Sequence, residues 1–471
     1  MFVFNYIYYK LKNLYDIIVG NFRFIYLINK ICKNNLNDLS EEELLKIKNL
    51  VIDNGAITIK FIQWYISNVT VEPNSKIDFI FGDLFDNCPI HSMKNTELIF
   101  NEDFKINLGD IVDFQSLEVI GSGSIGQVYK GNLFNGKEVA IKVKHPDVER
   151  IASYQMYSIN FVILLQKIKF FKDLLNIHFD LNDFIGNLLL QLEFKNEVFN
   201  CYRFRKIYEN NDMVIFPNVY YYSNNIIISE FIDGVEMDSL SLYKKQKVGL
   251  NFYCFILSSI LFNDFVHGDL HKKNWKVKIE DKKYKLIIYD FGICFQTGHL
   301  NCNKETWEAF EEFKVDEIID NFKYMIKESN NLSDKDIEEL QIRDKINNIH
   351  EEAFSAIKIV YIVLELLEKK NLLLSRIFFN ILVTMILLQK LFIEVEFVVV
   401  PSQTQDEKQK KNIDRLSDIM AYCKSTNTYH EVYNYLENKL NRLKQEDKMK
   451  IIDKTNYGDK ILELDNPLDF L

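Results

Sequence analysis

The chain has 471 residues, enough for about two to four domains of ordinary size. Its composition, 48% hydrophobic and 26% charged, is that of a folded protein and excludes wholesale disorder. A formal charge of −10 without a dominant basic stretch argues against a nucleic-acid partner. The seven cysteines form no Cys-x-x-Cys pair, which predicts free thiols in a reducing, intracellular compartment and no disulfide framework or zinc site.

The N-terminal segment predicts a helix and no secretory signal, because apolar residues follow Met1 directly. Charges such as Lys10, Lys12 and Asp16 argue against a membrane-spanning helix. Two interpretations stay open: a helix packed on the main domain, or an aromatic-rich helix lying on a membrane surface. We therefore expect a soluble or peripherally membrane-associated protein. The apolar positions with helical spacing are Ile7, Leu11, Leu14, Ile18, Phe22 and Ile25.

A second helix is predicted to begin at Ser40, with acidic residues in its first turn. An apolar helix follows Gly55 and carries Lys60 and Gln63, which share a face because they are three residues apart. Taken alone, Lys60 would be interpreted as a solvated surface residue, since most charges on helices are solvated.

From Phe114 the pattern changes to strands that surround the loop Gly121-Ser-Gly123-Ser-Ile-Gly126. The returning strand ends at Asn135-Gly136, a hairpin signal, and the third strand carries Lys142. Glycines let a backbone approach phosphates closely, and Lys142 can reach phosphate oxygens. In dinucleotide-binding folds such a loop opens into a helix, whereas here a strand follows. The combination predicts a kinase-like nucleotide-binding lobe.

Residues from 145 to about 190 predict a helical insertion, which is followed by Gln191-Leu-Glu193-Phe-Lys-Asn-Glu197. A kinase lysine needs a helical glutamate as partner, but Glu197 lies unusually far from Lys142 in the chain. Either another glutamate serves, or the chain is an unusual kinase with an insertion. The apolar residues 226–230 then predict a buried strand, followed by an ordinary turn or by a hinge whose backbone binds adenine.

The stretch His267-Gly-Asp269-Leu-His271-Lys-Lys-Asn274, followed by Asp290-Phe-Gly292, has the spacing of a kinase catalytic loop and metal site. A metal cluster of His267, Asp269 and His271 is an alternative, but it needs an extended segment and lacks a fourth ligand. Small-molecule phosphotransferases of the aminoglycoside and choline type share the loop pattern. The helix with Lys60 and Gln63 is not expected in those enzymes.

Beyond Gly292 there is neither an Ala-Pro-Glu sequence nor an obvious activation segment. Residues 307–400 predict helices, and the apolar run 377–389 predicts a buried core helix because it is too short to span a membrane. Residues 401–412 predict a polar linker. The tail after it, with Glu437 and Lys439, predicts a solvated surface helix.

Together these residues resemble the UbiB family of atypical kinase-like proteins, which is linked to coenzyme Q biosynthesis. The resemblance covers residues 55 to about 293, and more weakly to about 400. It rests on the helix with Lys60, Gln63 and Trp64, the loop 121–128, the segment 191–197 after an insertion, and the stretch 267–274. The family's insertion also accounts for the distance in sequence between Lys142 and Glu197.

The chain departs from the family pattern at several positions. Ile62 stands where the family's Lys-x-Gly-Gln motif has glycine, and Gln191-Leu192-Glu193 replaces a Glu-x-Asp or Gln-x-Asp motif. Gly121 and Gly123 stand where many members have alanines, and two lysines replace the Pro-Gly before Asn274. All polar positions of the catalytic loop are retained.

The resemblance implies an α+β, two-lobed protein-kinase-like fold with an N-terminal helical extension and a mostly helical C-terminal lobe. Four parts are expected: the extension (1–113), the nucleotide-binding lobe with its insertion (114–235), the lobe with the catalytic loop and metal site (236–400), and a linker with a helical tail (401–471).

By the same resemblance, Lys142 holds the α- and β-phosphates, Glu197 orients Lys142, and Asp269 occupies the catalytic-aspartate position. Asn274 and Asp290 bind magnesium. Lys60, Gln63 and Glu193 are expected to form a regulatory cover across the mouth of the cleft, which would exclude water. The implied nucleotide-contacting set is Gly121, Ser122, Gly123, Ser124, Gly126, Val128, Ala140, Lys142, Glu230 and Ile232.

The expected function is an ATP-dependent phosphotransferase or ATPase of the UbiB type, with ATP or ADP and Mg²⁺ as ligands. The acceptor of the phosphate is not specified and could be a small molecule, a lipid or a protein. A conventional protein Ser/Thr kinase is one alternative, favoured by the loop glycines but disfavoured by the missing activation segment. A nucleotide-binding pseudokinase scaffold is another, disfavoured because every catalytic position is filled.

Overall fold

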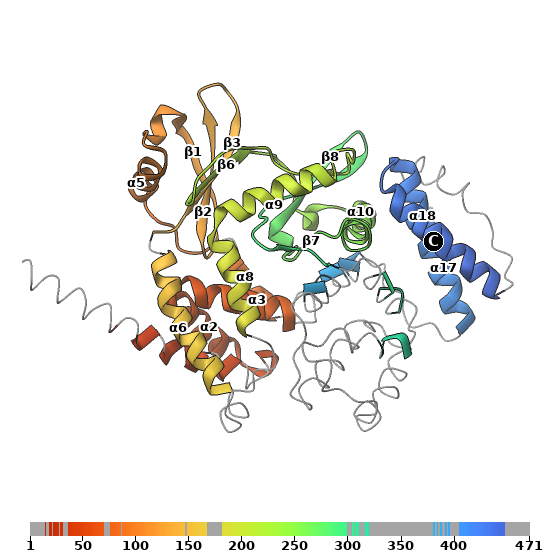
Figure 1. Ribbon diagram of the computed structural model, residues 1–471, viewed down its shortest axis with the longest axis horizontal. Coiled ribbons are helices and arrows are strands. Elements are labelled where there is room, and N and C mark those ends of the chain that lie inside the picture. Colours follow the sequence, from red (N-terminus) through yellow and green to blue (C-terminus); the bar gives the residue numbers. More distant parts are fainter. Residues whose placement is uncertain are drawn as a thin grey trace, which may run out of the picture. The chain divides into compact units, whose positions relative to one another are not determined.

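The computed structural model describes residues 36–69, 76–85, 87–146, 148–166, 181–298 and 405–447, with shorter runs and single positions within 15–31, 304–320 and 380–395. The chain divides into two compact units. The first comprises Met1–Phe199 and Asn218–Phe231, and the second comprises Asn200–Pro217 and Ile232–Leu471. Figure 1 shows the elements of both units.

The first unit contains a group of helices whose limits follow from local chemistry. Helix α2 (Glu41–Asn54) begins with a capping box: Ser40 Oγ accepts the Glu43 N–H at 3.3 Å, and the Glu43 carboxylate accepts the Ser40 N–H at 3.0 Å. It ends at Gly55, whose φ of 91° favours glycine. The other helices are α3 (Ala56–Val69), α4 (Lys76–Phe81), α5 (Met93–Phe104), α6 (Val148–Gln166) and α8 (Leu181–Leu192).

Two apolar clusters hold these helices together. One gathers residues of α2, α3 and α4 around Leu44, Ile47 and Ile62. The other joins α3 to α6 and α8 around Phe61, Ile159 and Leu188. Ile62, which stands where the family has glycine, is fully buried in the first cluster. The larger side chain is therefore accommodated by packing against neighbouring helices.

The same unit contains a five-stranded antiparallel sheet in the order β1-β2-β3-β6-β5. Its first hairpin carries the glycine loop, and Gly136, with a φ of 82°, allows the tight turn before β3. Tyr129, Ile141 and Ile228 lie in its core. The strands are β1 (Val112–Ser122), β2 (Gly126–Leu133), β3 (Glu138–Lys144), β5 (Val219–Tyr222) and β6 (Ile226–Glu230).

The second unit is built around α10 (Leu242–Leu261), whose last fourteen residues are buried. Helix α9 (Phe194–Ile207) begins in the first unit and ends in the second. A two-stranded and a three-stranded sheet carry the catalytic loop and the turn after it. Their strands are β4 (Val214–Ile215), β7 (Val266–His267), β8 (Trp275–Glu280), β9 (Lys283–Ile288) and β10 (Cys294–Phe295).

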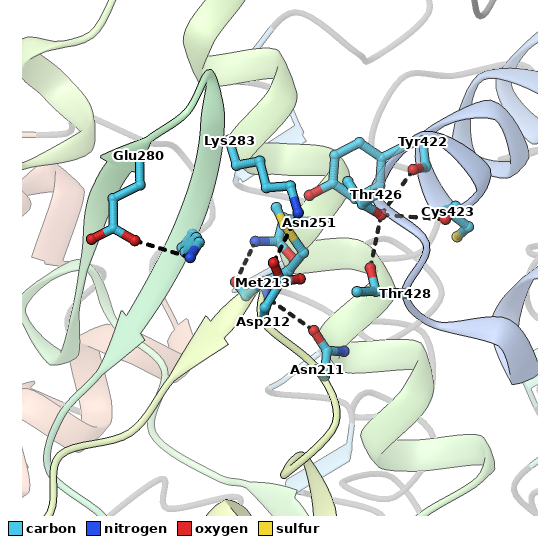
Figure 2. A network of polar contacts seen from close by, with 11 residues as sticks. Asn211, Asp212, Met213, Asn251, Glu280, Lys283, Tyr422, Cys423, Thr426 and Thr428 are labelled. Carbon is cyan, nitrogen blue, oxygen red and sulfur yellow. Dashed lines mark hydrogen bonds and ion pairs between the residues drawn. The ribbon is translucent and has the colours of Figure 1, made fainter.

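The C-terminal helices differ from the predicted linker and solvated tail. Helix α17 (Gln405–Thr426) already begins inside the predicted linker, and with α18 (His430–Asp447) it packs on α10 within the second unit. Figure 2 shows Asn251 of α10 donating its amide to the Met213 carbonyl at 2.9 Å, close to residues of α17. Asn251 also accepts a hydrogen bond from the Tyr429 hydroxyl at 2.7 Å. Lys439, expected in solvent, is only 5% exposed.

Several sequence-based predictions concern residues outside the described part. The helices expected between 307 and 400, including the run 377–389, are described only in short runs and at single positions. Near the N-terminus, Phe24, Leu27 and Ile31 are buried, whereas Ile18 and Phe22 of the predicted apolar face are exposed. Whether that face contacts a membrane stays a prediction. Among the described residues, no helix is both long enough and apolar enough to cross a bilayer.

Candidate functional site

The structure brings Lys142 of β3 and Glu197 of α9 together in an ion pair. The Lys142 ammonium lies 2.8 and 2.7 Å from the two carboxylate oxygens. Glu197 is buried and stands in the first turn of α9, where the helix dipole stabilises a carboxylate. The Phe194 ring lies 5.3 Å from the same ammonium. The sequence left open whether Glu197, beyond the insertion, or another glutamate pairs with Lys142. In the structure the partner is Glu197.

The glycine loop joins β1 to β2 with Ser122 and Ser124 buried. The Gly123 N–H donates to the Gly126 carbonyl at 2.9 Å, which closes the turn. A Cβ atom on Gly126 would lie 2.6 Å from the Val143 carbonyl oxygen, so this glycine is required by its contact with β3. Val128 pairs with Lys142 across the β2–β3 register.

The remaining positions of the predicted nucleotide set lie on or beside the same sheet. Ala140 of β3 pairs with Ser229 of β6. The Glu230 carboxylate accepts the Asn218 side-chain amide at 2.5 Å, which fixes the end of β6. Ile232, in the second unit, is buried, and its carbonyl accepts the Tyr289 hydroxyl at 2.9 Å.

The three residues of the predicted cover have different surroundings. Gln63 is buried and donates its side-chain amide to the Leu84 carbonyl at 2.5 Å. Lys60 is half-buried on the same helix. Glu193 is exposed between α8 and α9, and it accepts the Asn196 amide at 3.3 Å. The regulatory role of these residues stays a prediction.

In the second unit, His267 links the catalytic loop to the segment around Asp290. Its Nδ1 accepts the Asp269 N–H at 3.2 Å, so its proton is on Nε2, which donates to the Asp290 carbonyl at 2.7 Å. Burial lowers the pKa of His267 and keeps it neutral. Asp290 has a φ of 45°, a strained conformation for a non-glycine residue.

The candidate metal ligands are oriented by hydrogen bonds. Asn274 donates its Nδ2 to the Asp269 carbonyl at 2.7 Å, which leaves Oδ1 as an acceptor. The exposed Asp290 accepts the Gly292 N–H on Oδ1 at 3.0 Å. Both supply oxygen atoms, the donors that Mg²⁺ prefers, and nucleotide phosphates normally complete such a site.

The alternative metal cluster of His267, Asp269 and His271 is wrong. Both ring nitrogens of His267 are used in hydrogen bonds to the backbone. In the part of the chain that the structure describes, no group of three or more His, Cys, Asp or Glu side chains is placed to hold a metal ion.

Other residues around the catalytic loop were not predicted from the sequence. Phe204 of α9 packs near His267 and Phe291, with ring centroids 6.2 and 5.8 Å away. Lys272 forms ion pairs with Glu394 at 2.7 Å and Asp238 at 3.1 Å. No local signal marks these partners, because they come from distant parts of the chain.

The antiparallel sheet with its lysine–glutamate pair, and the His-Gly-Asp loop followed by Asp-Phe-Gly, define a protein-kinase-like domain. The family model described as the ABC1 atypical kinase-like domain matches residues 83–328, more than half of the chain. The chain belongs to this family, which confirms the resemblance to UbiB proteins and the kinase-like α+β fold.

The curated relatives include AarF domain-containing kinase 1 of Drosophila melanogaster, 24% identical over 270 residues, or 55% of this chain and 51% of that protein. Another is the probable serine/threonine-protein kinase abkC of Dictyostelium discoideum, 28% identical over 242 residues, 48% of this chain and 34% of the relative. The chain thus spans about half or less of the length of these relatives.

Among solved structures, the chain is similar to Rv3197 of Mycobacterium tuberculosis in complex with erythromycin. The TM-score is 0.38 at 17% identity, over 65% of this chain and 83% of that one. At this TM-score the likeness carries no argument about ligands or activity.

Proposed function

We propose that the chain is an atypical kinase or ATPase that binds an adenine nucleotide with magnesium and transfers or hydrolyses the γ-phosphate. The observation that carries the proposal is the ion pair of Lys142 with both carboxylate oxygens of Glu197. A largely buried ion pair contributes little net stability, because desolvation offsets the attraction. The pair is therefore better explained by function than by stability: in kinases the glutamate holds the lysine in position to bind phosphates.

In this proposal Lys142 binds the α- and β-phosphate oxygens, and Glu197 keeps its ammonium in place. Asn274 Oδ1 and the Asp290 carboxylate are the protein ligands of magnesium. Bound magnesium would neutralise charge on the β- and γ-phosphates. Asp269 orients the attacking oxygen, which belongs to a water molecule or to an acceptor hydroxyl.

The acceptor distinguishes the candidate activities. A small molecule, a lipid and a protein all carry hydroxyl groups that Asp269 could orient. One matched relative is named a probable serine/threonine-protein kinase, which keeps a protein acceptor among the candidates. The filled positions 142, 197, 269, 274 and 290 favour catalysis over a pseudokinase scaffold.

The test measures magnesium-dependent binding and turnover of ATP by the full chain beside Lys142→Ala and Asp290→Asn. We expect both variants to lose turnover by at least about a hundredfold, because each removes a group that holds phosphate charge. Lys283→Ala is a matched control, since Lys283 is a strand lysine paired with Asp212 at 2.8 Å. Asp281→Asn is the second control, since Asp281 also has a positive φ, 49°.

The outcomes separate the candidate functions. Binding without turnover by the unaltered chain would support the scaffold alternative. If the unaltered chain failed to bind any adenine nucleotide, the proposed function would be wrong.

A further inference from the structure

A line of hydrogen-bonded side chains in the first unit ends at the glycine loop. It runs from Gln127 through Tyr129, Thr96 and His91 to His145, and we call it the histidine relay. Gln127, Tyr129 and Thr96 are buried. The residues come from α5, β2 and the segments after α4 and β3, so tertiary packing alone brings them together.

The Gly123 carbonyl can only accept, so with both histidines neutral a single set of donors satisfies every hydrogen bond of the relay. Gln127 Oε1 accepts the His91 backbone N–H at 2.8 Å, which leaves the amide Nε2 to donate to the Tyr129 hydroxyl. In this set Tyr129 donates its own proton to Thr96 Oγ1, 2.7 Å away. Thr96 in turn donates to His91 Nε2 at 2.9 Å.

The two histidines form the last hydrogen bonds of the relay, which end at the glycine loop. Because His91 Nε2 accepts, its proton is on Nδ1, which donates to His145 Nδ1 at 2.8 Å. The His145 proton is therefore on Nε2, which donates to the Gly123 carbonyl at 3.0 Å. One proton fits between the two Nδ1 atoms, and a second would place two N–H groups face to face. Burial, and then His145, lowers the pKa of His91 to about 4, and burial lowers the pKa of His145.

The relay ends on a peptide group of the loop that lies between two carbonyls held by backbone hydrogen bonds. The His145 N–H binds the Ile125 carbonyl at 2.8 Å, and the Cys88 N–H binds the Ser122 carbonyl at 2.6 Å. The Gly123 carbonyl, between these two, accepts from the His145 side chain. In a trans peptide the C=O and the next N–H point in opposite directions, so this bond also sets the direction of the Ser124 N–H.

That direction matters because phosphate-binding loops act through backbone N–H groups, whereas a carbonyl oxygen turned toward a phosphate would repel it. We propose that His145, held in one tautomer by His91, is a positioning residue that turns the Gly123 carbonyl away from the nucleotide phosphates and presents the Ser124 N–H to them. The inference rests on the proposed function, since it assigns the loop a phosphate ligand. His145 itself contacts the loop and not the nucleotide.

The first experiment measures the dissociation constant of a fluorescent ATP analogue with magnesium, and the KM and kcat of ATP turnover. For His145→Phe we expect binding and KM to weaken by about tenfold, the effect of one lost hydrogen bond, with kcat changed much less. For His145→Gln, whose side-chain amide can still donate to Gly123, we expect values within about threefold of the unaltered chain. His430→Phe and His430→Gln, at an exposed histidine, are matched controls.

The second experiment determines the tautomers of His91 and His145 in the absence of nucleotide. Nitrogen-15 spectra of labelled histidines should show the proton of His91 on Nδ1 and that of His145 on Nε2. His91→Phe should remove the fixed tautomer of His145. The opposite tautomers would overturn the relay whatever the nucleotide results are.

The outcomes separate the inference from the proposed function. Unweakened nucleotide binding by a folded His145→Phe variant would overturn the inference alone. A Gln variant as weak as the Phe variant would also overturn it, because the shape of the imidazole and not its donor would then matter. No binding by the unaltered chain would overturn the proposed function and the phosphate role together, while the tautomers would still decide the relay.

Discussion

Each compact unit uses a neutral histidine to hold a backbone carbonyl, but the two units fix the proton of that histidine in different ways. In the second unit His267 accepts from the N–H of Asp269, two residues away, and donates to the Asp290 carbonyl. In the first unit His145 accepts from His91, 54 residues away, and donates to the Gly123 carbonyl. The histidine-to-carbonyl hydrogen bonds are alike in the two units. The hydrogen bonds that fix the histidine tautomers differ: one comes from a nearby backbone amide and the other from a distant side chain.

The difference concerns how each arrangement can fail. The tautomer of His267 is set by a backbone amide of its own loop, which no substitution at Asp269 other than proline removes. The tautomer of His145 depends on an ordered series of side chains, and losing any one of them leaves buried donors or acceptors unsatisfied. The catalytic loop should therefore be the more robust of the two to substitutions at a distance.

The largest effect is expected from breaking the local arrangement at its centre. His267→Phe keeps the aromatic packing but removes the donor to Asp290, whose backbone is strained. We expect turnover to fall by about a hundredfold or more, because displaced reacting groups are that costly. Stability should fall by about 2 kcal/mol, because the polar groups left buried lose their partner. Turnover assays and urea unfolding measure both, beside His430→Phe. Full turnover by this variant would contradict the positioning role of His267.

The pH dependence of stability sharpens the comparison. Burial lowers the pKa of His91, His145 and His267 below the ordinary value of 6.5, and that of His91 reaches about 4. The unfolded chain binds these protons first, so the stability contribution is present above about pH 6.5 and is lost as the pH falls toward 4. Each histidine contributes at most about 1.4 kcal/mol per pH unit, and less where it is partly exposed.

Replacing both relay histidines tests how much of the dependence of unfolding free energy on pH comes from His91 and His145 and how much from His267. In His91→Phe/His145→Phe the slope between pH 6.5 and 4 should decrease, and the share of His267 should remain. Urea unfolding at a series of pH values measures it. An unchanged slope would show that the pair does not stay neutral in the folded chain.

A smaller effect is expected from interrupting the relay at a distance from the loop. Thr96→Val keeps the shape of the side chain but removes the acceptor of the Tyr129 hydroxyl proton and the donor to His91 Nε2. We expect a loss of about 1–2 kcal/mol in the free energy of unfolding. Thr96→Ser should recover most of it, since the hydroxyl is restored. Equal losses for Val and Ser would indicate that the methyl packing and not the hydroxyl is important.

The smallest effect concerns the two lysines that replace Pro-Gly in the catalytic loop. Lys272 pairs with Glu394 and Asp238, so Lys272→Ala should reduce stability by up to about 1 kcal/mol, as for a partly exposed ion pair. Lys273→Ala, at the exposed neighbouring position, is the matched control and should change less. High salt should reduce the difference between the two variants. A difference that did not respond to salt would argue against an ion-pair origin.

Local patterns in the sequence determined much of the fold. The capping box at Ser40 predicts the start of α2, and the Asn135-Gly136 turn between apolar strands predicts the β2–β3 hairpin. The spacing from His267 to Asn274, followed by Asp290, marks the catalytic loop because its geometry is made by neighbouring residues. Even the hydrogen bond that sets the His267 tautomer lies within that short stretch.

Only the tertiary structure decided which distant residues meet. It paired Lys142 with Glu197, which the residues alone left open and the family resemblance implied, placed His91 against His145, and brought Glu394 to Lys272. It also buried Lys439 in a tail expected to be solvated. Hydrophobic periodicity shows which face of an element is buried, but it does not specify which polar group on another element lies opposite. That pairing follows from the packing of whole elements. The same packing brings together the residues of the histidine relay, which ends at the glycine loop.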